Sequence, residues 1–178
     1  MLCMKTPPHY VLTGGPCAGK TTLILELKKR GYSVLEESAR AVIDEMLAEG
    51  KTLADIRNDE GGFQKAVLRR KVTAEAEVPD DTICFFDRAV PDSIAYYREN
   101  SIPEDDELWN ACRASRYAKI FLLDLLPLVI DEARNESPEL AARIQAALDR
   151  GYHELGYEPV SVSVMPVKER ADFILANL

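Results

Sequence analysis

The sequence predicts an α/β protein with three layers, in which helices cover both faces of a five-stranded parallel sheet. Two observations predict this fold. Short apolar segments alternate along the chain with segments of helical periodicity, and several apolar segments are apolar throughout, as strands buried on both faces are. Because no repeat or long linker interrupts the alternation, we expect residues 1–178 to form a single domain.

Five segments are predicted to be strands because they are short, apolar or β-branched, and bounded by turn residues. In chain order they are "YVLTG" (10–14), "YSVLEE" (32–37), "TICFFD" (82–87), "KIFLLD" (119–124) and "PVSVSV" (159–164). The third is the clearest buried strand, and we expect its cysteine, Cys84, to be a small core residue.

Helices are predicted between and after these strands, where apolar residues recur at helical spacing. The expected ranges are 20–30, 38–49, about 63–77, 91–100, about 105–115, 137–151 and 167–178. Three of these helices should end at glycines, namely Gly31, Gly50 and Gly151. Two should begin at side-chain caps, with Asp92 and Ser137 as the expected N-cap residues.

The composition of the chain limits the kinds of partner that it can bind. The chain carries 22 Lys and Arg against 30 Asp and Glu, a formal net charge of −8, so we expect no nucleic-acid partner. No apolar run approaches the roughly 18 residues that span a membrane, and the first residues lack a signal-peptide pattern. The four cysteines are widely spaced, which favours a reduced, cytoplasmic setting without a zinc site. No protein partner is indicated.

One glycine-rich segment follows the first predicted strand and opens the first predicted helix. It matches G-x-x-x-x-G-K-[ST], the phosphate-binding P-loop pattern, with Gly14, Gly15, Pro16, Cys17, Ala18, Gly19, Lys20 and Thr21, and Thr22 continues the helix. Its glycines let backbone N–H groups converge on an anion, and the helix adds its positive N-terminal end. Lys20 would bring its charge to the outer phosphates of ATP, and the Thr21 hydroxyl would be a ligand of Mg²⁺.

Charged residues follow the second and third strands. The carboxyl ends of parallel strands are where ligands bind in open α/β sheets, so we expect these residues at one crevice. Asp87 would help to hold Mg²⁺ or accept a proton, and Arg88 would neutralise phosphate charge or position the acceptor. Either Glu36 or Glu37 could be the general base for a substrate hydroxyl, and we select Glu37, although a solvent-exposed pair is equally open. Arg40, one helical turn later, could pair with Glu37 or reach a substrate anion.

Three further segments carry charges. Residues 124–137, "DLLPLVIDEARNES", form a candidate lid that could bring Arg134 to the transferring phosphoryl group; the alternative, which we favour less, is a surface arginine. The basic cluster 69–71 is expected to be a solvated helix face without a role. The segment 59–62, "DEGG", matches D-x-x-G but follows a poor strand candidate, so we expect a loop there.

The order of "YVLTGGPCAGKTTL", "EESAR", "FFDRAVPDSIAYY", "DEAR" and "GYHELGYEPVSVSVMPVKERADFIL" resembles that of small P-loop proteins classed as NadR-like AAA domains, the predicted ATPases similar to nicotinamide riboside and deoxynucleoside kinases. The resemblance implies a kinase-type core with a lid after the fourth strand, and it implies ATP and Mg²⁺ as cofactors. It places Glu37 and Arg40 near the substrate, Asp87 and Arg88 at the metal and acceptor, Arg134 in the lid, and 164–168 beside adenine. The Asp87–Arg88 pair resembles the acid–Arg pair of deoxynucleoside kinases.

Three functions are compatible with these features. The first is an ATP-dependent phosphotransferase acting on a small hydroxyl compound. The second is a nucleotide-dependent switch or binding protein that reports its bound state to a partner. The third is an ATPase that transfers the phosphoryl group to water. The chain lacks the Asn-Lys-x-Asp run that reads guanine, which favours ATP over GTP.

Overall fold

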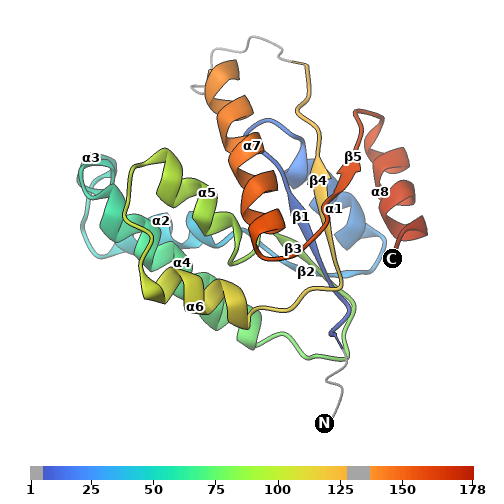
Figure 1. Cartoon of the computed structure of the whole chain (residues 1–178), viewed down its shortest axis with the longest axis horizontal. Helices are drawn as coiled ribbons and strands as arrows, with labels where there is room; N and C mark the ends of the chain where they lie inside the picture. Colours follow the sequence, from blue (N-terminus) through green and yellow to red (C-terminus); the bar gives the residue numbers. More distant parts are fainter. Residues whose placement is uncertain (1–5, 128–136) are drawn as a thin grey trace.

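The computed structural model describes residues 6–127 and 137–178 and contains a five-stranded sheet (Figure 1). The strands are β1 (His9–Thr13), β2 (Ser33–Leu35), β3 (Cys84–Asp87), β4 (Lys119–Leu123) and β5 (Val160–Val162). All neighbouring strands are parallel, in the order β2-β3-β1-β4-β5. The predicted three-layer fold with a five-stranded parallel sheet is therefore confirmed.

The strand order fixes where loops can meet. β1 lies at the centre and pairs with β3 on one side and β4 on the other, so that Leu12 faces both Asp87 and Phe121 in register. The chain leaves β1 toward β2 on one side, whereas β4 and β5 lie on the other side. The carboxyl ends of β1, β3 and β4 therefore border one crevice at the point where the strand order reverses, the usual ligand position in such sheets.

Helices lie on both faces of the sheet and beside it. Among the described residues they are α1 (Lys20–Lys29), α2 (Ser38–Ala48), α3 (Leu53–Asn58), α4 (Glu60–Ala76), α5 (Asp92–Glu99), α6 (Asp106–Ala114), α7 (Pro138–Glu154) and α8 (Val167–Ala176). α1 and α8 pack on each other, and α5 packs on α7 and α4. Figure 1 shows α8 on one side of the sheet and α2, α3, α4 and α6 gathered on the other.

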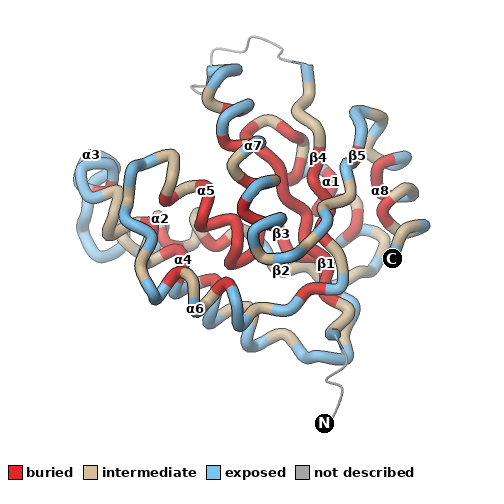
Figure 2. The backbone as a smooth tube through the Cα atoms, viewed as in Figure 1, coloured by how far each residue is buried: buried red, intermediate tan, exposed pale blue. Residues whose placement is uncertain are grey.

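Alternation along the strands divides the core between the two faces. Leu12 and Phe121 join a buried cluster that includes Leu23 of α1 and Ile174 of α8. Their strand neighbours project to the opposite face, where Val11 packs in a cluster containing Tyr152 of α7. The central strands are buried along their whole length in Figure 2, which is why they read as continuous apolar runs.

The region before β3 differs from the expectation. Residues 53–58 form helix α3, which begins with a capping box between Thr52 and Asp55. Helix α4 begins at Glu60, three residues earlier than predicted, because the Asp59 carboxylate accepts a hydrogen bond from the Gly62 N–H. The prediction of a loop over 59–62 is therefore wrong: Asp59 caps a helix, and the other three residues form its first turn.

The two predicted helix caps have different outcomes. Ser137 caps α7 as expected, because its hydroxyl accepts from the N–H of Leu140. Asp92 is not an N-cap: Pro91 occupies that position, and Asp92 is the first residue of α5. Most of the predicted lid, including Arg134, lies outside the described residues. Within the described ranges, none of the helices combines the length and apolar character that a membrane-crossing segment requires.

Candidate functional site

The loop between β1 and α1 has a backbone that requires glycine at two positions. A Cβ atom on Gly14 would lie 2.8 Å from the carbonyl oxygen of Leu123 on the neighbouring strand, and its φ is +148°. Gly19 has a φ of +82°, in the left-handed region, and directly precedes the first turn of α1. These two constraints hold the loop close against β4 and turn it sharply into the helix.

The turn into α1 leaves backbone donors available for an anion. The N-cap residue is Gly19, so no side chain caps the first turn within the described chain. The first intrahelical bond runs from Leu23 N–H to the Gly19 carbonyl. The N–H groups of Lys20, Thr21 and Thr22 precede that bond, and they lie at the positive end of the helix. Thr21 and Thr22 are both exposed there.

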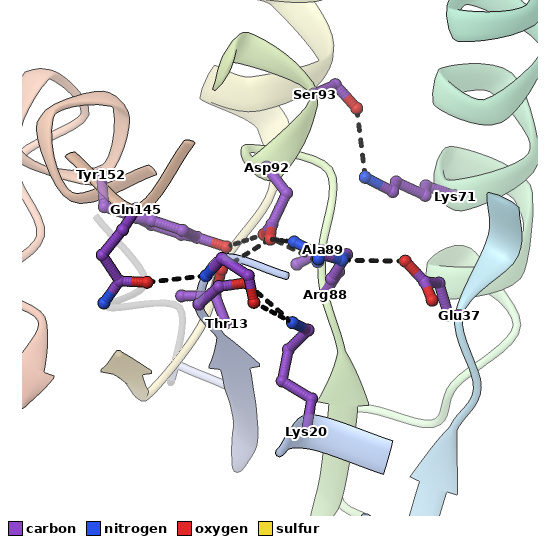
Figure 3. Close-up of polar contacts among 12 residues, drawn as sticks. Thr13, Lys20, Glu37, Lys71, Arg88, Ala89, Asp92, Ser93, Gln145 and Tyr152 are labelled. Atoms are coloured by element: carbon purple, nitrogen blue, oxygen red, sulfur yellow. Dashed lines mark hydrogen bonds and ion pairs between the residues drawn. The ribbon is translucent and has the colours of Figure 1, made fainter. Parts of the chain in front are cut away.

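Lys20 is held over the loop rather than pointing into solvent. Its side chain is buried, and its Nζ donates hydrogen bonds of 2.8 Å to the carbonyls of both Gly14 and Gly15 (Figure 3). Burial, together with the positive charge of Arg88, lowers the pKa of the ammonium to about 8. The carboxylates of Glu37, Asp87 and Asp92 act on Lys20 through space, but none of the ion pairs among the described residues includes it. A cation held by neutral carbonyls in this way is suitably placed to receive the phosphates of a nucleotide.

Two residues that sequence reasoning missed hold the loop from the far end of the chain. Arg170 of α8 is buried, and its Nη1 donates to the carbonyl of Ala18 at 2.6 Å. The same guanidinium donates to the carbonyls of Ser163 and Asp124, so it joins three loops. Gln145 of α7 accepts from the Gly15 N–H at 2.6 Å and donates to the Leu123 carbonyl. Arg170 lies within the last segment that carries the family resemblance, but neither that segment nor any motif around Gln145 indicates a contact with the loop.

The carboxyl end of β3 places a second charged group beside the P-loop. Arg88 has a φ of +64°, an unusual value for a residue with a side chain, and its guanidinium is buried. Its Nε donates a 2.8 Å hydrogen bond to Oε1 of Glu37, and its guanidinium lies 5.2 Å from the centre of the Tyr96 ring. Figure 3 shows Arg88 between Glu37 and Asp92. The structure therefore brings Glu37 and Arg88, which come from separate motifs, into direct contact.

Asp87 is buried with an unsatisfied oxygen. Its Oδ1 has no hydrogen-bond partner among the described residues, an uncommon state for a buried carboxylate. Burial, together with the negative charge of the nearby Glu37 carboxylate, raises its pKa to about 6. An orphaned carboxylate oxygen beside a phosphate loop fits a divalent cation, which binds hard oxygen ligands. Asp87 and the exposed Thr21 hydroxyl are each of the oxygen-donor type that Mg²⁺ binds.

Asp92 supports this site, a role that sequence reasoning missed. Its carboxylate is fully buried and accepts hydrogen bonds from the Thr13 hydroxyl at 2.6 Å, the Ala89 N–H at 3.0 Å and the Tyr152 hydroxyl. One oxygen also lies 3.5 Å from Nη1 of Arg88. Asp92 thus connects the end of β1, the loop after β3 and α7. The helix-cap role expected from the sequence includes none of these contacts.

The two candidate bases after β2 lie in different surroundings. Glu37 contacts Arg88 at the site. Glu36 is exposed and pairs instead with Lys28 of α1 at 2.8 Å. Arg40 is exposed on α2, and it is not among the described residues that line the cavity beside Glu37. Of these three residues, the structure brings only Glu37 to the P-loop side of the crevice.

A cavity of about 350 Å³ opens beside this group. Pro16 of the P-loop, Glu37 and Arg88 border it at one end. Its walls include apolar side chains of α2 and α4, among them Ile43 and Phe63. A cavity of this size, with apolar walls and a few charged groups, is typical of a small-molecule site.

The fold and the P-loop define the class: this is a P-loop NTPase with the architecture of nucleoside and nucleotide kinases. The chain belongs to the AAA-domain family, whose model matches residues 9–170. The resemblance inferred from the motifs is thereby confirmed. No curated protein matches the chain.

Several solved structures share the fold. A NadR protein in complex with NR has a TM-score of 0.65 and 16% identity; the match covers 94% of this chain and 49% of that one, so the chain spans about half its length. Thymidylate kinase from Ehrlichia chaffeensis has a TM-score of 0.65 and 13% identity, covering 97% and 98% of the two chains. Deoxyadenosine kinase from M. mycoides has a TM-score of 0.63 and 13% identity, covering 95% and 97%. At these identities the similarity concerns the fold.

Proposed function

We propose that the chain is an ATP- and Mg²⁺-dependent phosphotransferase that acts on a hydroxyl group of a small compound. The observation that carries the proposal is the Glu37–Arg88 pair, which borders both the P-loop and a cavity large enough for a small molecule. A protein that transfers phosphate only to water has no need of such a cavity. The names of the structural neighbours, which include a nucleoside kinase and a nucleotide kinase, support the same reading.

Each residue has a role in this proposal. The loop amides and Lys20 would hold the triphosphate, and Thr21 and Asp87 would hold Mg²⁺, which neutralises charge on the phosphates. Glu37 would accept the proton of the acceptor hydroxyl while the hydroxyl oxygen forms a bond to the γ-phosphorus of ATP. The bond from that phosphorus to the bridging oxygen breaks, and ADP leaves. Arg88 would compensate the charge on the transferring group.

The family resemblance assigns two further arginines to the proposed site. Arg134, from the lid, would add a second positive charge to the transferring group when the segment closes. Arg40 is exposed one turn after Glu37, from where it would reach an acceptor only at the rim of the crevice. The segment 164–168 would border the adenine.

Turnover with a panel of acceptors tests the proposal. ADP formation from ATP and Mg²⁺ is measured with nucleosides, vitamins and simple alcohols, added singly. We expect at least one hydroxyl compound to raise turnover about tenfold or more above the rate in water, with a phosphorylated product detectable by mass spectrometry. Turnover that no member of the panel changes would instead identify an ATPase or a nucleotide-dependent switch.

A further inference from the structure

The basic cluster on α4 divides into two kinds of residue. Arg69 and Arg70 are exposed and pair with carboxylates, Arg69 with Glu107 at 2.7 Å and Arg70 with Glu45 at 3.1 Å. Lys71 is only 5% exposed and lines the cavity beside Glu37 and Arg88. The expectation that all three residues form a solvated helix face is therefore wrong for Lys71.

The ammonium of Lys71 has little protein to bind. Its Nζ donates to the Ser93 hydroxyl at 3.3 Å (Figure 3), and it takes part in none of the ion pairs formed among the described residues. An ammonium carries three donors, and burying a charge without a counter-charge is costly. Burial accordingly lowers the pKa of Lys71.

The nearest carboxylates are already engaged by other donors. Asp92 accepts from Thr13, Tyr152 and the Ala89 N–H. Glu75 accepts from the Tyr117 hydroxyl and the Val90 N–H, and Glu37 accepts from Arg88. These carboxylates influence Lys71 through space, but none of them makes an ion pair with it. A counter-charge for Lys71 can therefore be supplied by a ligand in the cavity.

The walls of the cavity limit the rest of the ligand. Apolar side chains from α2 and α4, including Ile43, Phe63 and Val67, line it together with Lys71. Such walls favour an apolar body, and a volume of about 350 Å³ leaves room for one of about the size of a ring. Figure 3 shows Lys71 on the Glu37 side of Arg88, away from Lys20. A ligand with its hydroxyl near Glu37 can therefore direct a second group toward Lys71.

We propose that the acceptor carries, in addition to its hydroxyl, an acidic group that binds Lys71, on a ring-sized apolar body. The inference rests on the proposed function, because it names the substrate class of the same site. An oxyanion would give the ammonium charge-assisted hydrogen bonds in a setting with little solvent, where they are strong. Carboxylate and phosphate share this chemistry, and the experiment separates them.

Binding of a matched series of probes tests the inference without requiring turnover. The probes are 4-(hydroxymethyl)benzoate, 4-(hydroxymethyl)phenyl phosphate and the neutral 4-(hydroxymethyl)benzamide, titrated calorimetrically into the full chain with ADP and Mg²⁺ present. We expect at least one acid to bind about tenfold or more tightly than the amide, and the tighter acid identifies the group. Equal binding of acids and amide, or no binding of either acid, overturns the inference.

Variants of the cluster assign the preference to Lys71. Lys71→Met should abolish the preference for the acid, Lys71→Arg should retain a part of it, and Arg70→Met, the adjacent exposed control, should leave it unchanged. Lys71→Gln provides a second neutral variant should the methionine disturb folding, and nucleotide binding verifies that the site is intact. A preference that survives both neutral substitutions overturns the inference.

The two proposals fail in different ways. Lys71-dependent binding of an acid without ADP formation from any hydroxyl compound would contradict the phosphotransferase while leaving the anion site in place. ADP formation that neutral acceptors stimulate as well as acids do, and that Lys71→Met does not change, would support the phosphotransferase and contradict the acidic acceptor.

Discussion

The Nε of Arg88 lies 2.8 Å from Oε1 of Glu37, although 51 residues separate them in the chain. The contact joins the carboxyl ends of β2 and β3, which are adjacent parallel strands. It fixes the orientation of the carboxylate beside the cavity that Pro16, Glu37 and Arg88 line. In the proposed reaction, this pair both positions the base and balances its charge.

Glu37→Gln should lower turnover about 10²- to 10⁴-fold, because the amide cannot accept the acceptor proton. Nucleotide affinity should change little, since Glu37 makes none of the loop contacts described above. Steady-state ADP formation and ADP calorimetry together measure both effects.

The neighbouring residue offers a matched control. Glu36→Gln makes the same chemical change one position earlier, at an exposed carboxylate that pairs with Lys28. It should leave turnover within about twofold of the wild type. Equal losses from the two substitutions would contradict the assignment of Glu37 as the base.

Lys20→Ala should weaken ATP binding about 10- to 100-fold, because it removes the buried ammonium beside the phosphate position. Calorimetric titration with a non-hydrolysable ATP analogue and Mg²⁺ gives the affinity. Lys28→Ala, at an exposed position on the same helix, is the control and should bind normally. Unchanged affinity in Lys20→Ala would remove the basis for the phosphate site.

Arg170→Met should destabilise the protein by about 2–3 kcal/mol and weaken ADP binding about tenfold, even at temperatures where the variant is fully folded. Three carbonyls, including that of Ala18 in the P-loop, lose their donor. Urea unfolding gives the first quantity and calorimetry the second.

An arginine elsewhere in the chain controls for the substitution itself. Arg116 also donates to carbonyls, those of Arg113 and Ser115, but it is exposed and makes no contact with the P-loop. Arg116→Met should change ADP affinity little. If Arg170→Met lost stability but bound ADP normally, Arg170 would be a structural residue without a positioning role.

Glu75 should make stability depend on pH. Burial raises its pKa from the ordinary 4.5 to about 7, so the folded chain holds a proton that the unfolded chain has released above pH 4.5. The stability from that proton is complete below pH 4.5 and is lost as pH rises to about 7. Asp87, whose pKa is raised to about 6, titrates within the same window, so the comparison requires a variant of Glu75.

Glu75→Gln stays neutral at every pH and should remove this part of the decline. The unfolding free energy of the wild type, measured in urea at pH 5, 6, 7 and 8, should fall relative to that of the variant by up to about 3 kcal/mol. A difference between the two proteins that is constant across this range, or that changes in the opposite direction, would show that Glu75 is ionised throughout.

Local patterns along the chain are enough to predict the fold class and the P-loop. Five apolar runs separated by helical segments can form little else than a covered parallel sheet, and G-x-x-x-x-G-K-[ST] specifies its own backbone. Both are local properties, because strand alternation, helix periodicity and glycine conformations are set by neighbouring residues. The start of α4 differs from the expectation for a local reason too, because Asp59 caps the helix where a loop is expected.

Which charged residues meet depends instead on how distant elements pack. The strand order β2-β3-β1 brings Glu37 to Arg88 and leaves Glu36 in solvent, although the two glutamates are adjacent in sequence. Packing of α4 against α5 buries Lys71 while its neighbour Arg70 stays exposed. Arg170 reaches Ala18 across 152 residues. Such contacts depend on the mutual packing of distant elements, and one sequence carries no local signal for them.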